Sequence, residues 1–465
     1  MARRALAPLA VLVGAFVFVS LPFASGAAVR TAAQTPELVW APATFVISGR
    51  GWGHGIGLSQ YGTLGYAEHG WSWQEIIEYY YPGTTLGTTP VKSIRVLLAS
   101  GRKKLMLRSA APFRVKDGTG AVYELASLQV TVDPSLRVEL ADGAGVAALP
   151  GPLTFMAGSA PLSFAGRSYR GTFRLEVVGK ALRLVNVVGL ELYLYGVVPS
   201  EVPHDWPEQA LRTQAVAART YALISRRSGS FDVYADVRSQ VYRGIAGEAA
   251  ETTAAVKATK GQVVYYEGEI ATTYFFSTSG GQTAAIEDVW PKSEPVPYLV
   301  SVSDPYDDLS PYHQWGPLVY SSATLAKKLK IRGPISDLTT ETNASQRVGE
   351  AYITGAGDFV TTTSGQAVRD ALGLRSTWFS AGVLALQRPK KAIPYGTTIE
   401  LMGRAHNVTN PALQSRIAGG AWQPVRPIAP DADGLFTVSL TPKETTQYRL
   451  TTGTAKSAAI KITVA

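Results

Sequence analysis

The sequence contains 465 residues, a length that predicts two to four domains, each able to bury its own core. It carries a formal net charge of +9, from 44 basic and 35 acidic side chains, and it has no cysteine. The lack of cysteine excludes disulfides and thiolate metal sites. The basic excess favours acidic partners in general, although an ordinary basic surface explains it equally well.

The first 26 residues are typical of a secretory signal peptide. Arg3 and Arg4 precede an apolar run at 9–19, and small residues near Gly26 mark the expected cut. The pair of arginines lacks a fuller twin-arginine motif. The apolar core is too short to cross a bilayer, although residues 5–24 could span one if left uncut. We therefore expect a secreted or cell-wall-associated, extracytoplasmic protein that contacts the membrane only if this segment stays uncleaved. Export and the absence of a Lys/Arg cluster argue against nucleic acid as a partner.

A glycine-rich segment at Gly49–Gly62 comes next. Its glycines permit positive φ and close backbone approach, so the loop can present His54, Ser59 and Gln60 to a ligand. A phosphate-binding loop is the alternative, but no dinucleotide pattern follows a strand and no lysine stands at P-loop spacing.

The pattern beyond this loop predicts a strand-rich α+β fold with a few helices. A helix is expected at 72–80, where Ser72 and Glu75 form a capping box. Alternating apolar and polar runs between 91 and 198, such as 93–98, 128–132 and 171–177, predict antiparallel strands.

A second helix is expected at 207–224, entered by Asp205 and lined by Leu211 and three alanines, which suits packing flat against a sheet. The last eighty or so residues predict strands at 398–402, 435–440 and 460–464, typical of a small immunoglobulin-like β-sandwich. The expected organisation is a signal peptide at 1–26, a main domain at 40–385 and a sandwich at 390–465. Within the main domain we expect a glycine-rich part at 40–88, a strand-rich insert at 90–185 and a core at 186–385.

Glu201 lies between Pro199 and Pro203, where the pattern predicts a rigid turn below an apolar strand end. A carboxyl group held near Trp206 and other apolar neighbours should have a raised pKa, which suits proton donation near neutral pH. A helix cap or a surface acid fits the composition equally well. Ser277 and Ser279 have no histidine nearby in sequence and no nucleophile-elbow signature.

Several separate segments resemble the stage II sporulation protein D family, also described as the SpoIID/LytB or amidase-enhancer domain. The matching segments are YLYGVVPSEVP at 193–203, QAVAARTY at 214–221, SQVY at 239–242, STSGG at 277–281, GLRSTWF at 373–379, GHGIGLSQYG at 53–62 and YYPG at 80–83. They cover roughly residues 45 to 380, and the C-terminal sandwich lies outside the resemblance.

The resemblance implies work on the cell wall. Sporulation members of the family are lytic transglycosylases, which cut the MurNAc–GlcNAc β-1,4 bond of peptidoglycan glycan strands without water and leave a 1,6-anhydro sugar. The family's catalytic glutamate falls on Glu201. One carboxyl group suffices for this chemistry, first as acid and then as base. Groove residues that bind sugar hydroxyls or orient Glu201 are expected to be His54, Gln60, Arg219, Gln240, Tyr242, Ser277 and Ser279.

Two departures from the family pattern matter. The glycine-rich loop often comes late in the domain, whereas here it comes first and must fold back to the site. Some members bind zinc through Cys and His in the segment equivalent to 232–242, where this chain has Tyr234, Arg238 and Ser239. We therefore expect no metal and no cofactor.

Two other functions stay open. The family's second name implies a non-catalytic modifier that binds the wall and stimulates a cell-wall amidase, an N-acetylmuramoyl-L-alanine amidase. An ordinary hydrolase would pair Glu201 with a second carboxylate, from Asp205, Asp236 or Asp304.

Overall fold

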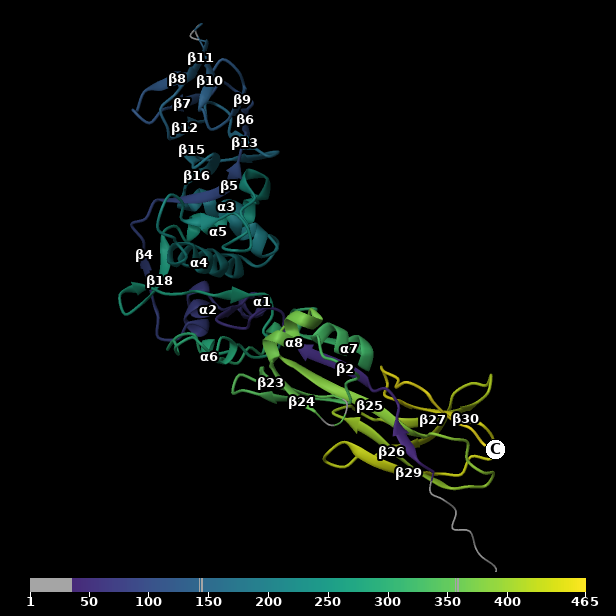
Figure 1. Ribbon diagram of the computed structural model, residues 1–465. Coiled ribbons are helices and arrows are strands. Elements are labelled where there is room, and N and C mark those ends of the chain that lie inside the picture. Colours follow the sequence, from purple (N-terminus) through teal and green to yellow (C-terminus); the bar gives the residue numbers. More distant parts are fainter. Residues whose placement is uncertain (1–35, 142, 144, 356, 358) are drawn as a thin grey trace, which may run out of the picture.

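The computed structural model describes residues 36–465, apart from 142, 144, 356 and 358. The expected signal peptide at 1–26 lies outside the described residues. A strand-rich part, a central group of helices and a C-terminal group of sheets follow one another in space (Figure 1). The prediction of a strand-rich α+β fold is confirmed. No helix within the described ranges is long and apolar enough to cross a membrane.

The strand-rich part is built on two antiparallel sheets and a hairpin. The larger sheet contains, in spatial order, β17 (Val233–Tyr234), β5 (Ser93–Arg102), β16 (Ala181–Gly189), β15 (Thr172–Val178), β12 (Leu153–Met156), β7 (Arg114–Lys116) and β8 (Val122–Glu124). Only β17 joins it in parallel. The smaller sheet contains β14 (Arg167–Tyr169), β13 (Leu162–Phe164), β6 (Leu105–Ser109) and β9 (Gln129–Val132), and the hairpin is formed by β10 (Arg137–Leu140) and β11 (Gly145–Ala148). Buried and exposed side chains alternate along β6 and β9, as the period-two pattern predicts.

A six-stranded sheet forms the centre of the C-terminal part. It contains, in spatial order, β21 (Gln314–Ser321), β2 (Thr44–Arg50), β25 (Phe379–Pro389), β26 (Ile399–His406) and β29 (Leu435–Leu440), with β1 (Leu38–Trp40) beside the end of β25. β25 runs across the expected domain boundary at 385–390, and it pairs with β2 on one edge and β26 on the other. The first strands of the described chain are therefore built into its C-terminal half.

Smaller sheets complete the molecule. They are formed by β22 (Asp337–Thr342), β23 (Val348–Thr354) and β24 (Val360–Ser364); by β28 (Gln423–Pro427), β27 (Ala412–Ile417), β30 (Thr446–Thr451) and β31 (Ile460–Ile462); by β19 (Glu269–Ile270), β18 (Gln262–Tyr266) and β4 (Thr85–Thr88); and by β20 (Phe275–Phe276) and β3 (Leu58–Ser59). The three strands expected after residue 390 are present as β26, β29 and β31. Their assignment to an immunoglobulin-like sandwich stays a prediction.

The helices carry part of the motif residues, chiefly those at 193–201 and 214–221. They are α1 (Gln60–Glu68), α2 (Trp73–Tyr80), α3 (Leu190–Glu201), α4 (Glu208–Ile224), α5 (Ala250–Ala258), α6 (Ile286–Val289), α7 (Ser322–Leu329) and α8 (Gly365–Leu372), with 3₁₀ turns η1 (Gly244–Gly247) and η2 (Asp307–Leu309). The expected capping box of α2 is present, with the Glu75 carboxylate accepting from the Ser72 N–H at 2.8 Å. α4 is also present, but Pro207 precedes it and no side chain caps it, so the expected role of Asp205 is wrong.

α4 separates two hydrophobic cores, which corrects the expectation of a helix lying flat on a sheet. Its Leu211 and Ala215 belong to the core of the strand-rich part, and its Val216 and Ala217 belong to the core around α2. Its close neighbours are α5, α1 and α3 together with β18. The buried alanines at 210, 215, 217, 218 and 222 permit this close approach from several sides, because their short side chains let the neighbouring elements come near.

A buried ion pair ties α3 to the elements around it. The Arg219 side chain is fully buried in α4 and forms a fork with Glu191 of α3, at 3.0 Å from Nε to Oε1 and 2.6 Å from Nη2 to Oε2. The same guanidinium donates to the carbonyls of Gln262 and Val256, and Glu191 also accepts from the Gly261 N–H. One cation thus fixes α3, α4, α5 and β18 relative to one another.

We predict that Arg219→Met lowers the free energy of unfolding by about 3–5 kcal/mol, because it leaves Glu191 and two carbonyls without their partner. Urea denaturation checks this, with Arg212→Met on the same helix as the matched control. Arg212 pairs with Glu208, whose side chain is 63% exposed, so its loss should cost about 0.5 kcal/mol. Equal losses in the two variants would contradict a central role for the buried fork.

Candidate functional site

Glu201 is the last residue of α3, which corrects the expectation of a turn below a strand end. The buried residues Leu190, Tyr193, Leu194, Val197 and Val198 recur at helical spacing. Pro199 lies inside the last turn, where its missing N–H removes one hydrogen bond without preventing the helix from reaching residue 201. Apolar and polar residues alternate along this segment as they do in a strand, but the segment is a helix.

The Glu201 carboxyl group is partly buried and has lost much of its hydration. Burial raises its pKa to about 7, and a hydrogen bond from the Val241 N–H offsets only part of that rise. No charged neighbour among the described residues contributes to the shift. The expectation of a raised pKa therefore agrees with the structure. At neutral pH such a group is present in both its protonated and its ionised form.

Gln240 and Tyr242 flank Val241 and hold it in position. Both side chains are almost fully buried. The Tyr193 hydroxyl donates to Gln240 Oε1 at 3.2 Å, and the Gln240 amide donates to the Ala218 carbonyl at 3.3 Å. The Tyr242 hydroxyl donates to Asn186 Oδ1 at 3.0 Å. Of the two roles expected for these residues, the contacts favour orientation of Glu201 through Val241.

A cavity of about 620 Å³ opens beside Tyr242, between the strand-rich part and the segment at 235–242. Its walls combine aromatic and charged side chains, a composition that suits sugars. They include Phe164, Arg167, Tyr169, Asp236 and Arg238. Glu201 does not line this cavity itself, but its hydrogen-bond partner Val241 is the chain neighbour of Tyr242.

Arg219 lies at the opposite end of α3 from Glu201. Its partner Glu191 precedes Glu201 by ten residues, which corresponds to roughly 15 Å along a helix. All of its contacts are within the protein core. Arg219 therefore fixes the helix that carries Glu201 rather than touching the carboxyl group.

His54 lies in the glycine loop with both ring nitrogens engaged. Nδ1 accepts from the Ile56 N–H at 3.0 Å, and Nε2 donates to the Phe275 carbonyl at 3.2 Å. Burial lowers its pKa to about 4, and the rings of Tyr274, Phe276 and Trp290 surround it. The imidazole is therefore neutral and holds the loop against the segment at 274–276.

The glycine loop folds back toward the helices, as its early place in the chain requires. Gly51 has a φ of +73°, and a Cβ there would lie 2.7 Å from the Ser279 carbonyl oxygen. Beyond the loop, the Tyr61 ring packs against Trp206, five residues after Glu201, with centroids 5.2 Å apart. Gln60 donates to Gln214 of α4 at 3.4 Å. The loop thus reaches the segment that follows the candidate catalytic residue.

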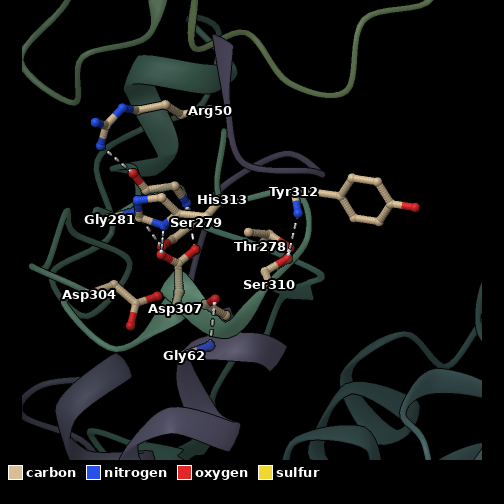
Figure 2. A network of polar contacts seen from close by, with 12 residues as sticks. Arg50, Gly62, Thr278, Ser279, Gly281, Asp304, Asp307, Ser310, Tyr312 and His313 are labelled. Atoms are coloured by element: carbon tan, nitrogen blue, oxygen red, sulfur yellow. Dashed lines mark hydrogen bonds and ion pairs between the residues drawn. The ribbon is translucent and has the colours of Figure 1, made fainter. Parts of the chain in front are cut away.

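Ser279 belongs to a separate polar network, drawn in Figure 2, and Ser277 adjoins that network through Thr278. Ser279 is fully buried, and its hydroxyl accepts from the Gly281 N–H at 3.1 Å. The Ser277 hydroxyl lies 3.2 Å from that of Thr278. These contacts shape the turn at 277–281 where it meets the glycine loop, and neither hydroxyl is bonded to a histidine.

Two buried aspartates lie at the centre of this network. Asp307 accepts from the Gly280 N–H at 2.7 Å and contacts Nδ1 of His313 at 2.5 Å. Asp304 accepts from the Tyr80 hydroxyl at 2.8 Å, and burial together with the charge of Asp307 raises its pKa to about 7. Asp307 and His313 were not expected as site residues, although they lie six residues apart around a Ser-Pro dipeptide, which is a local signal in the sequence.

The expected site residues therefore fall into three places. Gln240 and Tyr242 lie beside the backbone partner of Glu201, and Arg219 lies at the far end of its helix. His54, Ser277 and Ser279 join the glycine loop to the segment at 274–281, and Gln60 links that loop to α4. Within the described residues, no three His, Asp or Glu side chains gather in a way that could hold a metal ion.

A family model and several known proteins match parts of this chain, and the family-model match includes Glu201. Residues 178–266 match the family model SpoIID, described as a stage II sporulation protein. Stage II sporulation protein D of Bacillus subtilis (strain 168) is 31% identical over 227 residues, 44% of this chain and 64% of that protein. The protein of the same name from Bacillus amyloliquefaciens is 33% identical over 218 residues, 42% of this chain and 60% of that protein. The amidase enhancer of Bacillus subtilis is 35% identical over 192 residues, 40% of this chain and 26% of that protein. The chain thus spans less than two thirds of the length of each of these relatives.

The raised pKa of Glu201 predicts a pH-dependent gain in stability for Glu201→Gln. The folded protein keeps this proton up to pH 7, whereas the unfolded chain releases it near pH 4.5. The unfolded state therefore binds fewer protons between these values, and the wild type loses roughly 1–3 kcal/mol of stability as the pH rises through that window. Glutamine does not titrate, so the variant should gain by that amount relative to the wild type between pH 4.5 and pH 8.

Urea denaturation at both pH values measures this difference. Glu78→Gln, at an exposed position of α2, is the matched control and should show no such gain. A Glu201→Gln variant whose relative stability is the same at the two pH values would contradict the buried, uncompensated carboxyl group.

Proposed function

Starting from the SpoIID-family domain that this chain carries at residues 178–266, we propose that it acts on bacterial peptidoglycan. The proposed activity is that of a lytic transglycosylase, which cleaves the β-1,4 bond between MurNAc and GlcNAc in glycan strands. The observation that carries this proposal is the Glu201 carboxyl group, whose pKa burial raises to about 7. Such a group can both donate and accept a proton near neutral pH.

The proposed reaction uses Glu201 twice. Its protonated carboxyl group gives its proton to the glycosidic oxygen while the bond from that oxygen to C1 of MurNAc breaks. The resulting carboxylate then takes the proton of the MurNAc C6 hydroxyl, whose oxygen bonds to C1 and closes the 1,6-anhydro ring. The carboxyl group ends in the form in which it began, and no water is consumed.

The arrangement around Glu201 favours this reaction over hydrolysis, which requires a second carboxylate across the bond. Asp205 is exposed near the start of α4. Asp236 is held in a fork by Arg238, at 2.8 Å and 2.7 Å, and these bonds lower its pKa. Asp304 belongs to the network around Tyr80 and Ser279. None of the three has a contact with Glu201 in the described structure.

The cavity beside Tyr242 supplies a groove for the strand in this proposal. Phe164 and Tyr169 offer ring surfaces to sugars, and Arg167 and Arg238 offer donors to hydroxyl and carboxylate groups. The Arg238 guanidinium lies 3.8 Å from the ring centroid of Tyr234, which limits its motion. A strand in this groove would pass next to the segment that donates to Glu201.

The regions outside the domain have proposed roles that follow from this function. Residues 1–26 serve as a signal peptide, so the chain works outside the plasma membrane, secreted or associated with the wall. The region at 390–465 is an immunoglobulin-like sandwich that acts as a spacer or adhesion module. Sequencing the N-terminus of the exported protein tests the first of these roles.

A second candidate function rests on the 35% identity to the amidase enhancer of Bacillus subtilis. In this case the chain binds the wall and stimulates an N-acetylmuramoyl-L-alanine amidase without cutting glycan. Stimulation of a purified amidase that survives Glu201→Gln, with no cleavage of glycan by the wild type, would favour this function.

Incubation of purified glycan strands with the protein should yield 1,6-anhydro-MurNAc ends, detected by mass spectrometry. Glu201→Gln should lower the rate roughly 10²–10⁴-fold, the range for loss of a general acid. The matched control, Glu208→Gln, changes an exposed glutamate at the start of α4 and should keep the wild-type rate. Reducing ends without anhydro sugars would indicate a hydrolase, and anhydro products undiminished in Glu201→Gln would refute the mechanism.

The cleavage rate should fall as the pH rises above about 7, because the first step needs the protonated form of Glu201. A pH profile of kcat/KM between pH 5 and pH 9 measures this. A rate that stays constant from pH 7 to pH 9 would mean that another group supplies the proton.

A further inference from the structure

A second cavity, of about 560 Å³, lies where β2 ends against its neighbouring strands. Its walls come from three strands of the central C-terminal sheet and from β22. The lining residues used below are Arg50, Gln314, Trp315, Thr342, Trp378 and Asn407. It shares no lining residue with the cavity beside Tyr242, and β2 and β25 lie beyond α1 and α2 when viewed from α3 (Figure 1).

We infer that this cavity is a second glycan-binding site, which takes an amino-sugar unit that carries a carboxylate. The inference rests on the proposed function, because the muramic acid unit of peptidoglycan is a sugar of this kind. It goes beyond that function by assigning recognition to a surface remote from Glu201.

Two tryptophans give the cavity rigid apolar walls. The Trp315 ring lies across Gly49, where any Cβ would collide with it, and its Nε1 donates to the Gly51 carbonyl at 2.9 Å. The Trp378 carbonyl accepts from the Arg50 N–H at 2.9 Å. The Trp315 ring, held by its own hydrogen bond, loses little freedom when a sugar packs against it, and the backbone bond fixes the chain at Trp378, so this wall is preorganised for binding.

The charged group of the cavity is positive and forms no ion pair within the described residues. Arg50 is its one charged lining residue, and no carboxylate in the described part of the chain lies within ion-pairing distance, 4.0 Å, of its guanidinium. Arg50 donates to the Gly280 carbonyl at 3.1 Å, and the nearby Asp307 carboxylate is bonded to His313 and the Gly280 N–H instead (Figure 2). An arginine with remaining donors and no acidic partner suits a carboxylate from outside.

A second buried cation adds to this potential. Arg347 is 1% exposed, and its guanidinium carbon lies 5.1 Å from the Trp378 ring centroid, with that of Arg50 at 5.6 Å. Arg347 donates to the carbonyls of Ser279 and Gln282, and among the described residues it also has no carboxylate partner. Trp378 therefore lies near two positive charges, which favours an anionic occupant over a neutral or cationic one.

The remaining lining groups match a sugar rather than a simple anion. Gln314 and Asn407 contribute exposed amides, and Thr342 contributes an exposed hydroxyl. Amides and hydroxyls both donate and accept hydrogen bonds, as the hydroxyl and acetamido groups of an amino sugar require. The cavity volume also lies within the range of small-ligand sites.

Calorimetry on the full chain tests this inference. Glu201→Gln provides the background, so that no ligand is consumed, and the two probes are the GlcNAc–MurNAc disaccharide and chitobiose, which lacks the carboxylate. The first probe should bind at least tenfold more tightly. Arg50→Gln should lower its affinity about tenfold at this cavity, because it removes the charge that meets the carboxylate there.

Thr342→Trp should fill the cavity and weaken both probes, whereas Arg388→Gln, an exposed cation on β25 outside the cavity, should change neither. Unchanged urea midpoints show that the variants fold. The inference is overturned if neither probe binds, if the two bind equally, or if Arg50→Gln and Thr342→Trp retain the parent's affinity. A wild type that yields no anhydro sugar would refute the proposed cleavage, but it would leave this binding result standing.

Discussion

The ion pair between Arg219 and Glu191 fixes the position on which the proposed chemistry depends. Arg219 has no exposed surface, and it bonds to α3, to the end of α5 and to the start of β18 at once. Glu191 begins α3 and Glu201 ends it. Fixing the first turn of this helix against three other elements sets the depth at which its last residue lies, and that depth determines how much hydration the Glu201 carboxyl group loses.

Other buried contacts hold the backbone segment that bonds to the same carboxyl group. Gln240 and Tyr242 bond to Tyr193 and Asn186, and the backbone between them donates to Glu201. The glycine loop adds a further boundary, because Tyr61 packs on Trp206 in the segment after Glu201. Most of the polar residues expected in the groove thus act as supports. These supporting residues determine where the Glu201 carboxyl group lies, and no cation of the described chain neutralises that group.

The sequence predicted those features that depend on local chemistry. The capping box at Ser72 and the strands of the β5, β9 and β15 regions follow from neighbouring residues alone, and the structure contains all of them. The predictions failed where contacts between residues distant in the sequence determine the secondary structure or the side-chain partners. Residues 190–201 alternate like a strand and contain a proline, yet burial against α4 and α5 makes them helical. Nothing local to Arg219 indicates its pairing with a residue 28 positions away.

The candidate site shows the same division. The sign of the pKa shift of Glu201 could be inferred from its apolar neighbours, whereas its choice as the candidate catalytic residue came from the family resemblance. The two arginines beside Trp378 could not be inferred, because Arg50, Arg347 and Trp378 come from distant parts of the chain and meet only in the folded protein. A family resemblance identifies which positions match the motifs, but the hydrogen bonds of each side chain depend on how the strands pair in the folded protein.

The most direct test of this account is the titration of the Glu201 carboxyl group itself. Infrared or carbon-detected NMR difference spectra between the wild type and Glu201→Gln isolate its signal across pH 3 to 9. We expect a pKa near 7, raised by burial. A carboxyl group that titrates near 4.5, the value of a hydrated glutamate, would contradict it.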